Sequence, residues 1–261
     1  MLLGGDAPTP LDLRFRLGPF PVRVSSWFWL IMALFGDWVF QSLGPVYLLI
    51  WVACGFVSIL IHELGHAVMI RTFGSPSAIT LHGFGGYAEM PYPPTAAWKR
   101  MVIALAGPAA GFTLFGVVFA VQAATDPAAL PKHLSAALLF LYWMTLFWNL
   151  FNLLPVFQLD GGRVFREVCA ILRARNPDAI THVVSVGVAG VIAAYSVGRM
   201  VGVISPNALP EWLQWLRPGL FMTVWFVLLA VENYKMYQAA RRQYSPRFYG
   251  GDDDTPPWRR R

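Results

Sequence analysis

The stretch SILIHELGHAVMI, residues 58–70, places two histidines and a glutamate inside an otherwise apolar run. On a helix, His62 and His66 are four residues apart and project from one face, so their imidazoles can meet at one metal ion. Glu63 lies beside that face, where a carboxylate can accept a proton from a water held by the ion without being a ligand. The alternative is a pair of core histidines that hydrogen-bond to each other. Because ionisable residues are rare in apolar spans, the full HExxH pattern favours a metal centre.

A catalytic zinc ion normally has three protein ligands and one open position, so a third ligand is required. The best candidate is Asp160, in NLFNLLPVFQLDGGR, which follows a later apolar segment. His82 and His182 each stand alone in the sequence and are weaker candidates, because lone histidines usually have other roles. His133 is predicted to lie on the far side of the membrane, away from the others.

The composition is that of an integral membrane protein. Hydrophobic residues make up 56% of the 261 residues, charged residues only 13%, and the mean hydropathy is +0.51. We predict an all-α polytopic membrane protein with about six transmembrane helices and a small membrane-associated β-hairpin or loop between the second and third. The six predicted spans are Ser26–Gln41, Gly44–Ile70, Met101–Ala124, Leu134–Leu154, Thr181–Val203 and Gly219–Tyr237. The first is short and is interrupted by Gly36 and Asp37.

The distribution of Lys and Arg predicts the orientation of these spans. Seventeen of the basic residues fall in the termini and in the loops after the second and fourth spans, and three fall on the opposite side. The positive-inside rule then places both termini in the cytoplasm. The second and fourth spans both run inward, so the candidate ligands lie toward the cytoplasmic ends of their helices. We expect a cytoplasmic arm over 1–25, a membrane core over 26–238 and a disordered basic tail over 239–261.

Other classes of protein are disfavoured by the same composition. The net charge of +6 follows from the topology, and no basic patch interleaved with aromatic residues indicates nucleic acid. Cys54 and Cys169 form no CxxC pair and are interpreted as small apolar residues. The first 25 residues lack the apolar core of a cleaved signal peptide.

At this point the residues resemble the site-2 protease family, intramembrane zinc metalloproteases of peptidase family M50. The resemblance is carried by HELGH at 62–66, AGPAAG at 106–111, and NLLPVFQLDGG at 152–162, which is similar to the family's Asn-x-x-Pro followed by Leu-Asp-Gly. The Gly-rich segment GFGGYAEM at 83–90 resembles the family's membrane-associated hairpin.

The resemblance implies a function and a set of site residues. It implies that His62, His66 and Asp160 hold one zinc ion per chain and that Glu63 is the general base. It also implies that Asn152 lies near the metal, where its amide would donate a hydrogen bond to the developing oxyanion. The alternative for Asn152 is an interhelical hydrogen bond.

One departure from the family pattern is visible in AGPAAG. Gly111 stands where family members usually carry Asn, and the effect of this substitution does not follow from the sequence. Gly107 and Gly111 still form a small-xxx-small face for close helix packing, and Pro108 locally loosens the helix hydrogen bonds.

The expected reaction is hydrolysis of peptide bonds within or near the transmembrane segments of membrane-anchored regulatory proteins. It requires a hydrated cavity open to the cytoplasm, and a substrate helix must unwind before it is cut. The glycines of residues 78–90 have β-compatible flanks and would offer an edge to which an extended substrate adds as a strand. The predicted substrate-binding residues are Gly83, Phe84, Gly85 and Gly86; a plain glycine-rich loop is the alternative.

The expected partners are single-pass membrane proteins and the lipid bilayer, in a prokaryotic inner membrane. The loops between the second and fourth spans are too short for an inserted PDZ domain, and the segment after the sixth span is too short for a pair of CBS modules, which predicts a minimal form of the family. The oligomeric state does not follow from the sequence.

Three alternatives remain. A prenyl-peptide type of zinc protease takes its third ligand from a later glutamate, and the remaining glutamates do not form that pattern. A metal transporter needs polar groups that continue through the spans, whereas here the polar groups are predicted to cluster at one depth. A non-catalytic zinc-binding scaffold would not need Glu63.

Overall fold

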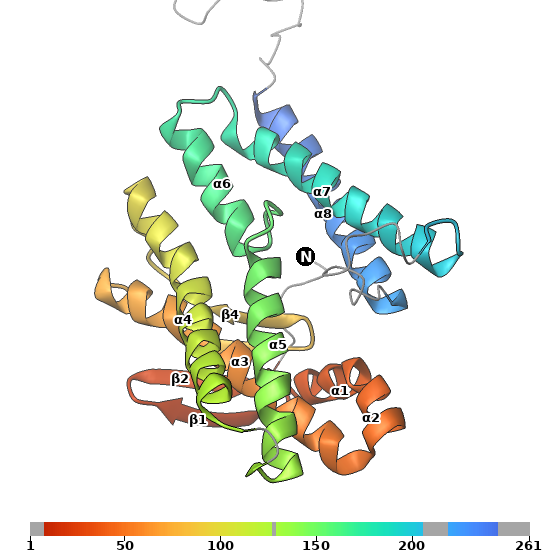
Figure 1. The fold of residues 1–261 in the computed structure, drawn as a ribbon. Coiled ribbons are helices and arrows are strands. Elements are labelled where there is room, and N and C mark those ends of the chain that lie inside the picture. Colours follow the sequence, from red (N-terminus) through yellow and green to blue (C-terminus); the bar gives the residue numbers. More distant parts are fainter. Residues whose placement is uncertain (1–7, 127–128, 206–218, 245–261) are drawn as a thin grey trace, which may run out of the picture. The chain divides into compact units, whose positions relative to one another are not determined.

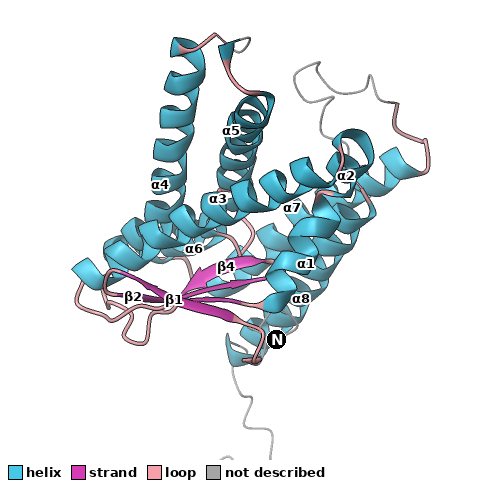
Figure 2. Ribbon diagram, turned by 90° about the horizontal axis from the view of Figure 1, so that it is seen from below, coloured by secondary structure: helices cyan, strands magenta, loops and turns pink. Residues whose placement is uncertain are grey.

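The structure is a computed structural model that describes residues 8–126, 129–205 and 219–244. Helices dominate, with one small sheet (Figures 1 and 2). The elements in chain order are β1 Leu13–Leu17, β2 Phe20–Val24, α1 Ser26–Phe35, α2 Asp37–Leu43, α3 Pro45–Thr72, β3 Ile79–His82, β4 Gly85–Ala88, α4 Ala97–Ala124, α5 Lys132–Asn152, α6 Asp160–Ile171, α7 Pro177–Met200 and α8 Leu220–Tyr244.

The chain divides into two compact units, Met1–Arg173 and Ala174–Arg261. The N-terminal unit contains the sheet and α1 to α6, with α3 packed against both α4 and α5 (Figure 1). The C-terminal unit contains α7 and α8, which pack against each other. All the predicted ligands therefore belong to the N-terminal unit.

Four helices, α3, α4, α5 and α7, are long and apolar enough to cross a membrane, which supports an integral membrane protein. The prediction of six spans is not confirmed. The first predicted span consists of two short helices, α1 and α2, which meet at Gly36. The sixth lies in α8, which is not among those four helices because Glu232, Asn233 and Lys235 interrupt its apolar sequence.

The sheet is larger than the predicted hairpin. Its strand order is β1-β2-β3-β4, with β2 and β3 parallel and the two outer pairs antiparallel. The sequence-based prediction missed β1 and β2, although LRFRL and FPVRV alternate in the period of a strand. β4 is an edge strand, so the glycine-rich segment forms one edge of the sheet.

One face of the sheet packs on the helix that carries the HExxH pattern. Val22 and Val24 of β2 and Leu81 of β3 are buried with Phe28 of α1 and Ile59 of α3. Side chains of a strand alternate between faces, so these apolar residues point to one side of the sheet. The core therefore fixes β3 and β4 beside the metal-binding pattern on α3.

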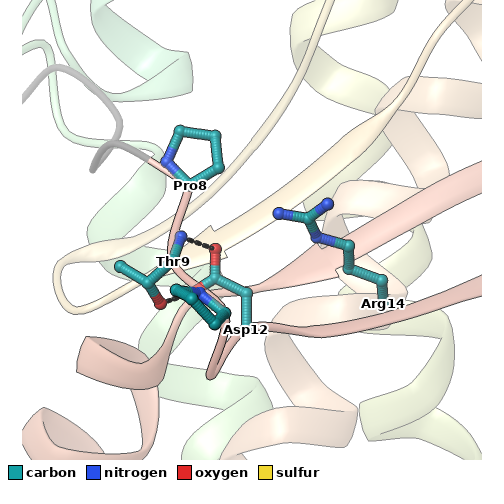
Figure 3. A pocket seen from close by; sticks show the side chains of 5 residues that line it. Pro8, Thr9, Asp12 and Arg14 are labelled. Carbon is teal, nitrogen blue, oxygen red and sulfur yellow. Dashed lines mark hydrogen bonds between the residues drawn. The ribbon is translucent and has the colours of Figure 1, made fainter.

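The segment before the sheet is held by Asp12. Its carboxylate accepts hydrogen bonds from the Thr9 hydroxyl (2.6 Å) and N–H (3.0 Å), from Arg23 (3.2 Å) and from the N–H of Ser26 (3.3 Å). The bonds from Thr9, drawn in Figure 3, are the main reason why the pKa of Asp12 falls to about 2. The open hollow shown there is lined by proline and polar side chains of residues 8–14 and lies outside the candidate site. Asp12 thus ties this turn to β2 and to the first residue of α1.

Candidate active site

The two histidines of HELGH meet, as the spacing on a helix requires. His62 and His66 lie one turn apart on α3, are 2% and 5% exposed, and their Nε2 atoms are 3.2 Å apart. Their rings meet edge to face, with centroids 4.9 Å apart. The buried face of α3 therefore presents two imidazole nitrogens to one point.

Asp160 reaches the same point from another helix. It is the first residue of α6, after the loop that follows α5, and it is 4% exposed. Its Oδ2 lies 3.0 Å from Nε2 of His62 and 3.3 Å from Nε2 of His66. A tetrahedral zinc ion with bonds of about 2.0–2.1 Å separates its ligand atoms by about 3.3 Å. The three donor atoms thus have the spacing that zinc requires.

The hydrogen bonds of the two Nδ1 atoms determine which ring nitrogens of His62 and His66 carry a proton. Nδ1 of His66 lies 2.7 Å from the carbonyl oxygen of Ile103, which can only accept, so this Nδ1 carries the proton. Nδ1 of His62 lies 2.9 Å from Oδ1 of Asn149, and the amide nitrogen of Asn149 donates to the Thr145 carbonyl. Both Nε2 atoms are therefore lone-pair acceptors that face each other and a carboxylate. Buried acceptors with no donor between them are costly, so the arrangement fits a cation.

Glycines of α4 let that helix approach the centre. A Cβ at Gly107 would lie 2.2 Å from Nε2 of His66, and a Cβ at Gly65 on α3 would lie 2.3 Å from the carbonyl oxygen of Ala106. Gly111, one turn after Gly107, faces Asn149 in the same way. The small residues of the AGPAAG segment thus allow α4 to approach His66 and Asn149 closely.

Glu63 lies between the histidines and the sheet. It is 4% exposed, and a carboxylate oxygen lies within 4.8 Å of the histidine donor atoms. A Cβ at Gly86 on β4 would be 2.5 Å from Cγ of Glu63, so the backbone of the strand passes directly beside this side chain. Asp160 makes the closer contacts with the two Nε2 atoms, which leaves Glu63 free for a different role.

The four predicted substrate-binding residues occupy the β3–β4 turn and the start of β4. Gly83 and Phe84 form the turn, where the Phe84 N–H donates to Nδ1 of His82 (3.3 Å). Gly85 has a φ of 131°, in the region that favours glycine, and Gly86 is the next residue of β4. The structure thus places His82 in the hairpin, not among the three converging donors.

Trp148 of α5 links this strand to the histidines. A Cβ at Gly85 would lie 2.9 Å from the Trp148 ring, and that ring meets His62 edge to face at 6.4 Å. Asn152, on the next turn of α5, donates a hydrogen bond from its amide to the Trp148 carbonyl (2.9 Å). Its predicted role at the oxyanion stays a prediction. The asparagine of α5 whose amide contacts His62 is Asn149, which the sequence-based prediction missed.

α6 is held in place at both ends. At its start, Gly161 and Gly162 sit so close to carbonyl oxygens of the preceding loop that a Cβ would lie 2.1 Å from each. Near its end, Glu167 accepts hydrogen bonds from Arg100 of α4 (2.6 Å) and from Arg166 (2.8 Å). Burial alone would raise the pKa of Glu167, but these hydrogen bonds outweigh it and hold the pKa below its usual value. These contacts fix the position of Asp160.

The chain is similar in sequence to known and putative zinc metalloproteases. The sequence profile of Peptidase family M50 matches residues 51–127 and 125–195. The chain is 34% identical to the putative zinc metalloprotease Rip3 of Mycobacterium tuberculosis over 211 residues, which are 79% of this chain and 47% of that protein. It is 30% identical to a putative zinc metalloprotease of Synechocystis over 177 residues, 66% of this chain and 43% of that protein. The chain thus spans about half the length of these relatives.

A solved structure has the same fold. The site-2 protease from Methanocaldococcus jannaschii matches with a TM-score of 0.53 and 22% identity, over 88% of this chain and 94% of that one. This likeness concerns the arrangement of the helices and strands.

Proposed function

The chain belongs to peptidase family M50, and on that basis we propose that it is a zinc-dependent endopeptidase that cuts membrane-anchored proteins within or near their transmembrane segments. The observation that carries the proposal is the convergence of the His62 and His66 Nε2 atoms and Asp160 Oδ2 within 3.3 Å of one another. Glu63 beside them separates this reading from a plain zinc-binding scaffold, which needs no base.

His62, His66 and Asp160 would hold one zinc ion per chain. Zinc bound there would supply Lewis-acid chemistry, which lowers the pKa of water toward about 7 and polarises a carbonyl group. Glu63 takes the proton of the attacking water and passes it to the nitrogen of the leaving amine as the C–N bond breaks. The amide of Asn152 donates to the oxyanion once its own helix bond to Trp148 is released.

The edge of β4 would hold the substrate in an extended form. The Glu89 N–H donates to the Ala78 carbonyl (2.8 Å), and hydrogen-bonded pairs alternate along an antiparallel ladder. Tyr87 and Gly85 therefore bond to β3, while the backbone groups of Gly86 and Ala88 point to the open edge. A peptide added there would lie beside Glu63, because Gly86 contacts its side chain.

The site and the termini are proposed to face the cytoplasm of a prokaryotic cell, with single-pass membrane proteins as substrates. The seventeen-to-three distribution of basic residues supports this orientation. Labelling of single cysteines introduced into the α4–α5 loop, in intact cells, tests it: protection of that loop from an impermeant reagent would contradict the orientation.

The first experiment measures cleavage of single-span substrates in liposomes together with zinc content, for the native chain and Glu63→Gln. We expect zinc to stay bound in the variant and the cleavage rate to fall by a factor of about 10² to 10⁴. Cleavage that survives in Glu63→Gln would rule out Glu63 as the base. Bound zinc without cleavage in either protein would favour the scaffold or the transporter.

A second experiment tests the edge of β4. Ala88→Pro removes an N–H that points away from β3, so the sheet keeps its hydrogen bonds while the substrate loses one. We expect a lower cleavage rate with unchanged zinc content, whereas Ala88→Ser, which keeps the N–H, should cleave normally. Equal rates for the two variants would argue against strand addition.

A further inference from the structure

Gly111 on α4 and Asn149 on α5 share one space beside the metal-binding pattern. A Cβ built at Gly111 would lie 2.2 Å from both Oδ1 and Nδ2 of Asn149. Any side chain at position 111 would therefore occupy the place of the Asn149 amide. The absence of a side chain at this one position of α4 admits a polar group from the neighbouring helix.

The hydrogen bonds of Asn149 give its amide one orientation. Nδ2 donates to the Thr145 carbonyl one turn earlier on α5, which leaves Oδ1 to accept from Nδ1 of His62 at 2.9 Å. Asn149 and Thr145 are 0% exposed and His62 is 2% exposed, so no solvent replaces these bonds. With its Nδ1 proton held in this way, His62 turns Nε2 toward Asp160.

We propose that Asn149 is a positioning residue for His62, and that Gly111 is the small partner that lets it act. The inference rests on the proposed function, since the group that His62 would bind is zinc. Asn149 contacts Nδ1 of His62, whereas Nε2 of the same ring faces Asp160, so Asn149 would act on the metal site only through the ring of His62. It sets the tautomer and ring orientation of a ligand, a kind of contact whose loss typically weakens metal binding by about 10- to 100-fold.

The chain contains its own control for this contact. In the C-terminal unit, Nδ1 of His182 on α7 lies 3.0 Å from Oδ1 of Asn233 on α8, and the Asn233 amide donates to the Leu229 carbonyl (2.8 Å). His182 belongs to no cluster of three or more His, Cys, Asp or Glu side chains within the residues that the structure describes. Asn233→Ala therefore removes the same pair of hydrogen bonds without touching the three converging donors.

The experiment measures the dissociation constant for zinc by competition with a chelator, and the visible absorption of the cobalt-loaded protein, on the full chain in detergent. We expect about 10- to 100-fold weaker zinc binding and an altered cobalt spectrum for Asn149→Ala. Asn233→Ala should keep both at the native values. Melting temperatures of the metal-free proteins report the purely structural cost of each change.

A compensating pair tests the role of Gly111. Gly111→Asn alone should weaken zinc binding and lower the melting temperature, because two side chains then compete for one space. Combined with Asn149→Ala, it supplies an amide from α4 and should bring zinc affinity back above that of Asn149→Ala alone. A double variant no better than Asn149→Ala would overturn the assignment of Gly111.

The remaining outcomes separate this inference from the proposed function. Native zinc affinity and cobalt spectrum in Asn149→Ala, or equal losses of affinity in Asn149→Ala and Asn233→Ala, would overturn the positioning role and leave the protease proposal intact. A native chain that binds no zinc would overturn both, and the Glu63→Gln comparison would show that failure independently.

Discussion

Two regions of the molecule contain the same hydrogen bond between a histidine and an asparagine, and only one of the two has the geometry of a metal centre. His62 with Asn149 and His182 with Asn233 are both buried, and both pairs join Nδ1 to Oδ1 across two helices, at 2.9 and 3.0 Å. Each asparagine also donates to a carbonyl of its own helix. The difference lies in the groups that converge. Nε2 of His62 lies within 3.2 Å of Oδ2 of Asp160 and of Nε2 of His66, whereas His182 belongs to no metal-binding cluster among the residues that the structure describes. A buried histidine that is hydrogen-bonded to an amide is therefore not by itself a metal site. A metal site also requires that three ligand atoms converge on one point, as Nε2 of His62, Nε2 of His66 and Oδ2 of Asp160 do.

The largest expected difference between the regions concerns metal content. His66→Ala removes one of the three converging donors, and we expect zinc in the purified protein to fall from about one ion per chain to near zero. His182→Ala removes a comparable imidazole from the C-terminal unit and should leave the zinc content unchanged. Elemental analysis of both variants checks this, and loss of zinc in His182→Ala would erase the distinction between the two regions.

The next largest effects are expected from two glycine-to-alanine substitutions, which should change the free energy of unfolding in opposite directions. A Cβ at Gly107 meets Nε2 of His66 at 2.2 Å, whereas a Cβ at Gly187 on α7 meets nothing within 4 Å. Gly107→Ala should destabilise the protein by about 1–3 kcal/mol through overpacking and weaken zinc binding. Gly187→Ala should stabilise α7 by about 0.5–1 kcal/mol, because glycine is costly inside a helix. Unfolding in denaturant with and without zinc measures both, and a stable, zinc-binding Gly107→Ala would show that α4 is not closely packed on His66.

The contrast between these regions also explains what the sequence predicts. HELGH has a fixed spacing on one helix, and Asp160 lies in a motif with its own glycines, so both could be recognised without coordinates. Asn149 is 87 positions from His62, and the Asn-x-x-Pro pattern begins at Asn152, so the local sequence directs attention to Asn152 and not to Asn149. Its contact depends on the close approach of α4 and α5 that Gly111 permits. The small-xxx-small pattern predicts such an approach but does not identify the residue that fills the space.

The remaining differences between the predicted and the observed elements have one local and one long-range cause. The apolar composition of residues 26–41 predicts one interrupted span, because composition does not show whether a helix continues. In the structure α1 ends and α2 begins at Gly36. The strands β1 and β2 are five residues each, and the pairing of β2 with β3 joins segments more than fifty positions apart. Such long-range pairing is not visible in a short alternating sequence.

The two units also differ in the charge of the side chains that join their helices. In the N-terminal unit, Glu167 of α6 accepts hydrogen bonds from Arg100 of α4, and its pKa is lower than its ordinary value of 4.5. A lowered pKa means that this stabilisation is complete above about pH 4.5 and is lost as the pH falls through the folded-state pKa. Glu167→Gln should lower stability by about 1–3 kcal/mol at pH 7 and remove this part of the acid dependence.

Melting temperatures of the native chain and Glu167→Gln between pH 7 and pH 3 measure that effect. Taking the difference between the two proteins cancels the titration of groups common to both. A difference that stays constant down to pH 3 would contradict a salt bridge as the contact that holds α6.

The smallest expected effect belongs to the neutral counterpart in the C-terminal unit. The Thr223 hydroxyl of α8 donates to the Ser196 hydroxyl of α7 at 2.8 Å, and both residues are buried. Hydrogen bonds between helices in a membrane contribute about 0.6 kcal/mol on average, because the separated helices find other partners. Thr223→Val should therefore cost about that amount, equally at pH 7 and at pH 4, since neither hydroxyl titrates there. A larger, pH-dependent cost would mean that this contact belongs to a titrating network, and the C-terminal unit would then resemble the N-terminal unit in more than its histidine and asparagine.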